Sequence, residues 1–110
     1  MKKITLRELC SKHDLEMADI LEYEEKGFIE PIDRVDGWFR NYPRETSAKI
    51  HVVRAYQKIG FSLDETKKIM EMPPEEAKLV LVSRVICLEQ LKKNIESAID
   101  LAKEIVRVQN

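Results

Sequence analysis

The sequence predicts a mostly α-helical fold, in which four short helices and a small β-hairpin precede one long coiled-coil helix. Apolar residues recur at helical spacing through most of the first 70 residues, an Asp-Gly pair interrupts this spacing, and the stretch 75–108 contains neither Gly nor Pro. A chain of 110 residues with 44% hydrophobic content suits one compact domain. We expect a domain over residues 1–72 and a dimerisation helix over residues 73–110.

Two short helices are predicted at the start of the chain. Thr5 and Glu8 have capping-box spacing, in which a hydroxyl and a carboxylate three residues apart satisfy the first turn, so a helix is expected over about 5–12. A second helix is expected over about 16–26, because Gly27 is suited to the position that follows a helix. Two short helices joined by a tight turn indicate a helix-turn-helix.

A β-hairpin and two more helices are expected next. Asp36-Gly37 favours a type I′ turn, which predicts a small hairpin, or wing, over residues 31–40. Pro43 suits the first position of a third helix, and Gly60 ends it. The segment Ser62–Glu65 has a second capping box and opens a fourth helix that reaches about residue 70.

The C-terminal third predicts one long helix that pairs with a second copy. After Pro73-Pro74, a continuous helix of about 34 residues would be about 50 Å long. Its apolar residues recur every seven positions, with one break at Arg84, as in a two-helix coiled coil. The expected homodimer interface consists of Leu81, Leu88, Leu91, Ile95, Ala98, Ala102 and Ile105. The alternative is that this helix folds back on its own domain.

Composition narrows the class of function. The net charge is −1, but residues 31–60 hold six Lys and Arg against three Asp and Glu, so a nucleic-acid partner would be held mainly there. Cys10 and Cys87 are isolated, which favours buried thiols over a metal site or a disulfide. His13 and His51 have no evident catalytic partner, so we expect no enzyme, no cofactor and structural roles for both imidazoles. No apolar run is long enough for a membrane span, and a cytoplasmic location is expected.

Four segments in register resemble the MerR family of bacterial transcription regulators. Residues 4–9 are similar to the opening helix of that family, and Tyr23–Ile29 to its Tyr-Glu-Glu-x-Gly-Leu-Leu segment. Phe39–Tyr42 resembles its Tyr-Arg-x-Tyr wing exit, and Gly60–Glu65 its Gly-Phe-Ser-Leu-Glu-Glu motif. The long helix follows where the family keeps its antiparallel dimerisation helix.

The resemblance implies a winged helix-turn-helix homodimer that binds double-stranded promoter DNA and regulates transcription. The second helices would enter successive major grooves, while the wings and third helices hold phosphates. Carried over to this sequence, the expected DNA contacts are Tyr23, Arg34, Arg40, Tyr42, Arg44 and Arg54. Family members that sense metals or drugs carry cysteines or a further domain beyond the dimer helix, so no effector or metal site is expected here.

The second helix departs from the family pattern because its exposed face is acidic. Glu16, Asp19 and Glu22 recur at spacing three, where the family usually has a Ser cap and arginines. Carboxylates repel phosphates and can only accept hydrogen bonds from bases. This face leaves an alternative open: a protein-binding adaptor that, like some proteins similar to the family fold, contacts the basic J-domain of a DnaJ-like co-chaperone. Trp38 likewise faces either DNA or the core.

Overall fold

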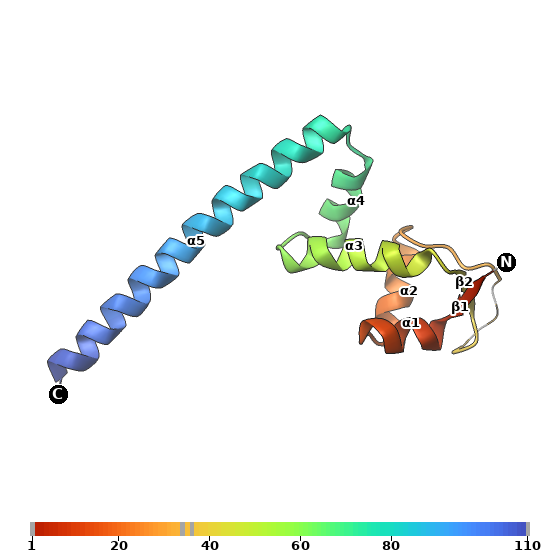
Figure 1. The fold of residues 1–110 in the computed structure, drawn as a ribbon, viewed down its shortest axis with the longest axis horizontal. Helices are drawn as coiled ribbons and strands as arrows, with labels where there is room; N and C mark the ends of the chain where they lie inside the picture. Colours follow the sequence, from red (N-terminus) through yellow and green to blue (C-terminus); the bar gives the residue numbers. More distant parts are fainter. Residues whose placement is uncertain (1, 34, 36, 110) are drawn as a thin grey trace. The chain divides into compact units, whose positions relative to one another are not determined.

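The computed structural model describes residues 2–33, 35 and 37–109 and confirms the predicted fold class. The described chain contains five helices and two short strands (Figure 1). Their order is β1 (Lys3–Thr5), α1 (Leu6–His13), α2 (Met17–Glu25), β2 (Asn41–Pro43), α3 (Thr46–Lys58), α4 (Leu63–Glu71) and α5 (Pro74–Gln109). The chain divides after Met70 into two compact units.

The small sheet differs from the predicted hairpin. Strand β1 pairs with β2 in an antiparallel register that places Ile4 opposite Tyr42, so the two strands flank both α1 and α2 rather than the Asp36-Gly37 turn. No strand is found among the described residues of 31–40, and Asp36 itself lies outside the described residues. The predicted pairing of two strands within residues 31–40 does not occur among the described residues, and the sheet of the wing is formed by β1 and β2 instead.

Backbone hydrogen bonds join the loop before β2 to the start of α1. The Leu6 amide donates to the Arg40 carbonyl at 2.8 Å, and the Arg7 amide donates to the Trp38 carbonyl at 3.1 Å. The predicted capping box supplies the next bond, since the Glu8 amide donates to Thr5 Oγ1 at 3.1 Å. Amides of a first helical turn have no partner within the helix. The loop and the capping box together satisfy these donors and hold residues 38–40 in place.

The core of the first unit lies between the sheet and helices α1, α2 and α3. Its members are apolar or aromatic and almost fully buried: Ile4, Leu6, Leu9, Cys10, Ile20, Tyr23, Phe28, Ile29, Tyr42, Ile50 and Val53. Helix α3 begins at Thr46, three residues later than predicted, because Pro43 pairs with Lys3 in the sheet. Helix α2 ends before Gly27, whose φ of +84° is the left-handed conformation that the sequence predicted for this residue.

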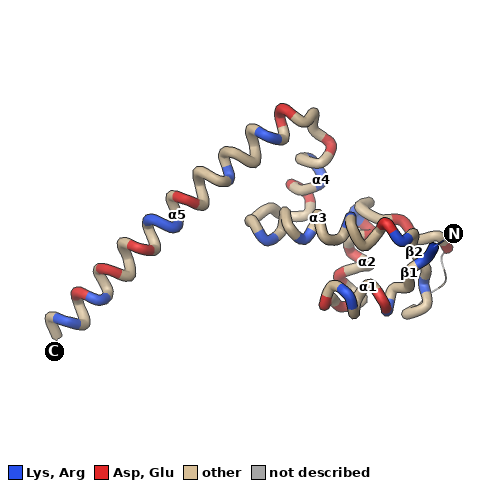
Figure 2. Tube along the Cα trace, in the orientation of Figure 1, with Lys and Arg blue, Asp and Glu red and all other residues tan. Residues whose placement is uncertain are grey.

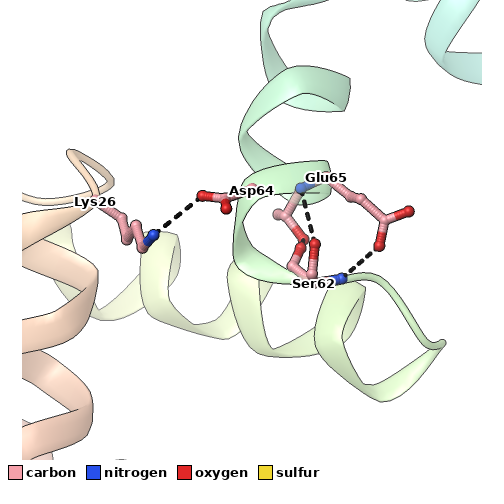
Figure 3. A network of polar contacts seen from close by, with 5 residues as sticks. Lys26, Ser62, Asp64 and Glu65 are labelled. Atoms are coloured by element: carbon pink, nitrogen blue, oxygen red, sulfur yellow. Dashed lines mark hydrogen bonds and ion pairs between the residues drawn. The ribbon is translucent and has the colours of Figure 1, made fainter.

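Helix α4 is capped as predicted and is tied to the end of α2. The Glu65 amide donates to Ser62 Oγ at 3.1 Å and the Ser62 amide donates to Glu65 Oε1 at 2.9 Å, as Figure 3 shows. In the same view, Lys26 Nζ at the end of α2 lies 3.1 Å from Asp64 Oδ1. Lys67 Nζ donates to the Gly27 carbonyl at 2.8 Å. These bonds fix the start of α4 within the first unit.

Helix α5 is the second unit and has no buried residue along its 36 residues. Leu88, Leu91, Ile95 and Ile105 are each between 40% and 59% exposed, although they are large and apolar. Helices in proteins owe most of their stability to the packing of an apolar face against other elements. The exposed apolar side chains therefore leave α5 without the packing that stabilises the other helices. Among the described helices, none combines the length and apolar content that crossing a membrane requires.

Candidate nucleic-acid interface

The first two helices form the predicted helix-turn-helix. Helix α1 ends at His13, and the residue after it, Asp14, has a left-handed φ of 53°. The Leu15 amide donates to the Cys10 carbonyl at 2.9 Å and closes the turn. Helix α2 then starts at Met17 and buries Ile20 and Tyr23 against the core. Its other side is exposed, as a helix that enters a groove of DNA must be.

The exposed side of α2 carries the three predicted carboxylates. Glu16, Asp19 and Glu22 are all exposed in the structure. Asp19 has a local role, because its Oδ2 accepts a hydrogen bond from the Glu16 amide at 3.0 Å at the start of the helix. Carboxylates near a helix N-terminus satisfy free amides and offset the helix dipole. Part of this acidic pattern is therefore explained by helix capping.

Arg40 and Tyr42 lie in the core rather than on the surface. Arg40 Nη2 lies 2.5 Å from Glu24 Oε1, with the side chains only 11% and 12% exposed, and Tyr42 Oη donates to Glu24 Oε2 at 3.3 Å. The ion pair raises the pKa of Arg40. Burial, followed by the charge of Glu24, raises the pKa of Tyr42 to about 12. Both side chains thus bind Glu24, and these contacts connect β2 and the residue before it to α2.

Tyr23 and Arg54 also make contacts within the domain. Tyr23 is 3% exposed and its hydroxyl donates to Gln57 Oε1 at 2.7 Å. Arg54 is half-buried, and its guanidinium donates to the His13 carbonyl at the end of α1. A cation at this position also interacts favourably with the C-terminal end of the helix dipole. These two bonds join α2 and α1 to α3.

Arg44 is exposed, whereas the expected contact Arg34 lies outside the described residues. Along α3 and the residues just before it, basic groups are spaced by seven, three and four residues from Arg44 to Lys58, which places them on one helix face. Figure 2 shows Lys and Arg positions along this helix and near the end of α1. We call the following set the α1–α3 basic surface: Lys12, His13, Arg44, His51, Arg54 and Lys58.

Sequence reasoning assigned Arg44 and Arg54 to phosphate contacts but treated both histidines as structural. The structure brings the histidines together with those arginines. His13 and His51 line the same two surface depressions, one of which Arg44 and Lys12 also line and the other Arg54 and Lys58. The helical spacing of Arg44, His51 and Lys58 was the signal that could have identified this surface.

The loop before β2 presents aromatic side chains. Trp38 is 44% exposed and Phe39 is 71% exposed, so neither is part of the core. Trp38 borders a shallow depression with Arg7, Ser11 and Leu15 from the first helix and turn. Exposed aromatic side chains beside cations suit contacts with a nucleic acid or with a protein.

No three His, Cys, Asp or Glu side chains lie together as metal ligands within the described part of the chain. Cys10 is buried, which raises the pKa of its thiol, and Cys87 is exposed on α5. The candidate site therefore consists of an exposed α2, an aromatic loop and a cationic surface, all carried by a helix-turn-helix with a short sheet. This combination defines the class of winged helix-turn-helix proteins.

The chain belongs to the MerR HTH family. The model described as "MerR HTH family regulatory protein" matches residues 4–73, which is more than half of the chain. Proteins of this family are regulators and not enzymes. The match includes the whole helix-turn-helix, β2, α3, α4 and all of β1 except Lys3, and it ends just before α5.

Curated relatives agree with the family. The nodulation protein NolA of Bradyrhizobium elkanii is 36% identical over 64 residues, which is 58% of this chain and 29% of NolA. The chain therefore spans less than a third of that relative. The mercuric resistance operon regulatory protein of Bacillus cereus is 27% identical over 97 residues, covering 86% of this chain and 74% of that protein.

Solved structures share the fold. The N-terminus of MtaN, the Bacillus subtilis multidrug transporter activator, has a TM-score of 0.70 at 18% identity and covers 94% of this chain and 97% of that one. HiNmlR, a MerR family regulator that lacks the sensor domain and was crystallised with promoter DNA, has a TM-score of 0.69 at 13% identity, covering 96% of this chain and 88% of that one.

Proposed function

We propose that this protein is a regulator of transcription that binds double-stranded promoter DNA as a homodimer. The observation that carries the proposal is the family match over residues 4–73, which includes every element of the helix-turn-helix. The fold shared with HiNmlR, which was crystallised on promoter DNA, supports the same function.

The geometry supports two different roles for the residues expected to contact DNA: contact with phosphate for the exposed ones and positioning of α2 for the buried ones. Arg44 is exposed and Arg54 half-exposed on the α1–α3 basic surface, where guanidinium groups suit the geometry of phosphates. Tyr23, Arg40 and Tyr42 are buried, and their bonds hold α2, β2 and α3 in place. We therefore assign phosphate contact to Arg44 and Arg54, and we assign to the buried three the positioning of α2.

A DNA-selection experiment tests this proposal. The purified protein would be incubated with sheared DNA of its host, and the bound fragments sequenced. A regulator enriches discrete promoter fragments, and affinity for them falls with salt. Arg44→Ala is expected to lower the slope of log affinity against log salt by about one, because one phosphate contact is lost. Lys68→Ala, an exposed cation on α4, is the matched control.

An absence of any enriched fragment would contradict the regulator function. An Arg44→Ala variant that keeps the full salt slope would contradict only the assignment of this contact. Arg40→Ala is unsuited to the test, because removing one partner of a buried ion pair destabilises the fold by itself.

The homodimer would form through α5. The interface we propose consists of the heptad positions Leu81, Leu88, Leu91, Ile95, Ala98, Ala102 and Ile105. Supporting it, the large members from Leu88 onward are 40–59% exposed in the single chain, and the two alanines allow close approach of two helices. Pairing of two such helices would bury this stripe and stabilise α5.

Sedimentation equilibrium tests the dimer. The parent protein is expected to have twice the mass of one chain, and Ile95→Glu to have the mass of one, because the substitution places a charge in the middle of the apolar seam. Glu96→Gln alters the exposed neighbour and is expected to remain dimeric. A monomeric parent protein would contradict the proposal.

A second candidate function rests on the acidic face of α2. Glu16, Asp19 and Glu22 are exposed and would attract a basic surface such as the J-domain of a DnaJ-like co-chaperone. A double variant, Glu16→Gln with Glu22→Gln, separates the two functions. It is expected to strengthen DNA binding if α2 lies against DNA, because two repulsive charges are removed, and to weaken binding of a purified J-domain if the adaptor function holds.

A further inference from the structure

The end of α1 and the exposed side of α3 concentrate titratable and cationic groups at one place. His13 is the last residue of α1, and its Nε2 lies 2.8 Å from Ser47 Oγ in the first turn of α3. Arg54 donates to the His13 carbonyl. One surface depression is lined by Lys12, His13, Arg44, Ser47, Ala48, His51 and Val52, and no acidic side chain of the described residues lines it.

The charges around His13 are predominantly positive. The groups that face the two depressions are Lys12 from α1, Asp19 and Tyr23 from α2, and Arg44, His51, Arg54 and Lys58 from α3 and the residues before it. Asp19 is the one carboxylate in this set, and it already accepts the Glu16 amide. Burial, then the charges of Lys12, Arg54 and His51, lowers the pKa of His13. The surface therefore has an excess of positive charge that an anion would relieve.

We propose that the depression between His13, His51, Lys12 and Arg44 is a binding site for a phosphate group, and that occupation of this site is coupled to protonation of the imidazoles. The phosphate belongs either to the DNA backbone, in which case the inference rests on the proposed function, or to free inorganic phosphate. In both cases the site supplies a guanidinium, an ammonium and two imidazoles to one anion.

The sign of the coupling follows from the charges. In the free protein, burial and then the neighbouring cations hold the pKa of His13 below its usual value, so the imidazole is neutral near neutral pH. A phosphate at the depression would favour the charged imidazole and raise that pKa. Phosphate binding then takes up protons, and affinity increases as the pH falls. One unit of pKa difference between the bound and free states corresponds to about a tenfold change in affinity.

The chain contains only two histidines, and both lie on this surface. An imidazole is the side chain whose charge ordinarily changes between about pH 5 and 8. A change in affinity across this range therefore reports on the proposed site.

The experiment is a fluorescence-anisotropy titration of a mixed-sequence DNA duplex of about 30 base pairs at about pH 8 and about pH 5.5, at fixed salt. The parent protein is expected to bind about tenfold more tightly at the lower pH. The variant His13→Gln with His51→Gln is expected to gain less than about twofold between the same two pH values. At position 13, glutamine can retain the hydrogen bond to Ser47. The single variant His51→Gln changes an exposed residue and leaves the core undisturbed. It is expected to lose part of the pH gain.

Lys68→Gln is the control, since it removes an exposed charge on α4 and is expected to keep the full pH gain. In a parallel arm, proton NMR follows the two imidazoles through a pH titration with and without inorganic phosphate, at constant ionic strength. A higher midpoint for His13 with phosphate alone would assign the site to free phosphate as well.

DNA binding that does not change with pH, or a pH gain that survives in the double variant, would exclude the DNA backbone as the source of the phosphate while leaving the proposed function intact. Either result together with an unchanged His13 midpoint in inorganic phosphate would overturn the inference. If the parent protein binds no DNA at either pH, the proposed function is contradicted. The NMR titration then decides whether the depression binds free phosphate. A raised His13 midpoint would then support a site for free phosphate, and an unchanged midpoint would overturn it.

Discussion

The two units of this chain differ in where their stability comes from. Among the described residues, the first unit has a core cluster of eleven buried side chains from the sheet, from α1, α2 and α3 and from the segment just after α2. Two lysine contacts tie the start of α4 to the end of α2. Helix α5 is longer than any element of the first unit, yet it buries none of its residues. The first unit contains its own packing, whereas α5 leaves its apolar side chains exposed.

This difference shows how one hydrophobic pattern can have two structural outcomes. Leu6 and Leu9 lie on an α1 face that is covered by other elements of the same unit and have no exposed surface. Leu88 and Ile95 recur with similar regularity, but they are 40% and 59% exposed. Periodicity identifies the apolar face of a helix and does not identify what covers it. The predictions below test this contrast from the largest expected effect to the smallest.

The largest effect is expected from matched leucine truncations in the two units. Leu9→Ala should lower the free energy of unfolding by about 3 kcal/mol, because Leu9 is fully buried and its loss leaves a cavity. Leu101→Ala, at a side chain that is 66% exposed and outside the heptad seam, should change it by less than about 0.5 kcal/mol. Urea denaturation measures both. Equal effects would contradict the division into a packed unit and an unpacked helix.

An alkaline titration tests the buried network around Glu24. The pKa of Tyr42 is raised to about 12 in the folded chain, against about 10 in an unfolded chain. Between these values the unfolded state loses the phenolic proton first, so stability should fall as the pH rises from about 10 to about 12, by on the order of 2 kcal/mol. Thermal melting over this range measures the loss.

Tyr42→Phe is the control for the alkaline effect. The variant loses the hydrogen bond to Glu24 at every pH but has no phenolic proton at this position, so its stability should fall less steeply above about pH 10. The same slope in both proteins would show that another group causes the alkaline loss.

A smaller effect is expected at the start of α4. Ser62→Ala should lower the stability of the first unit by about 1 kcal/mol, because the Glu65 amide loses its acceptor. Lys26→Gln should have a smaller effect than Ser62→Ala, since Lys26 and Asp64 are both exposed and their pair is screened by solvent. Hydrogen exchange at the first α4 amides would locate the change. If Lys26→Gln had the greater effect, the ion pair rather than the cap would hold α4.

Local chemistry made several elements predictable. The Thr5–Glu8 and Ser62–Glu65 capping boxes form with the expected bonds, because both partners lie within one helical turn. Gly27 ends α2 in the left-handed conformation that glycine adopts without strain. The long α5 followed from a stretch that contains no Gly or Pro.

Nonlocal contacts account for the errors and for the parts of the site that were missed. The β1–β2 pairing joins residues almost forty positions apart, so no local turn motif predicted it. The same pairing places Pro43 in a strand rather than in a helix. Arg40 and Arg44 have the same side chain four residues apart, but one is buried against Glu24 and the other is exposed. Nothing in their own identity separates these two environments.

The sequence by itself determined the helix boundaries set by caps and glycine, the apolar face of each helix and the family, because these depend on neighbours along the chain or on motifs in fixed order. The tertiary structure alone decided which arginines and tyrosines are buried. It also decided that His13 and His51 share one surface. These outcomes depend on charges and packing contributed by segments distant in the sequence, so they cannot be predicted from a local sequence pattern.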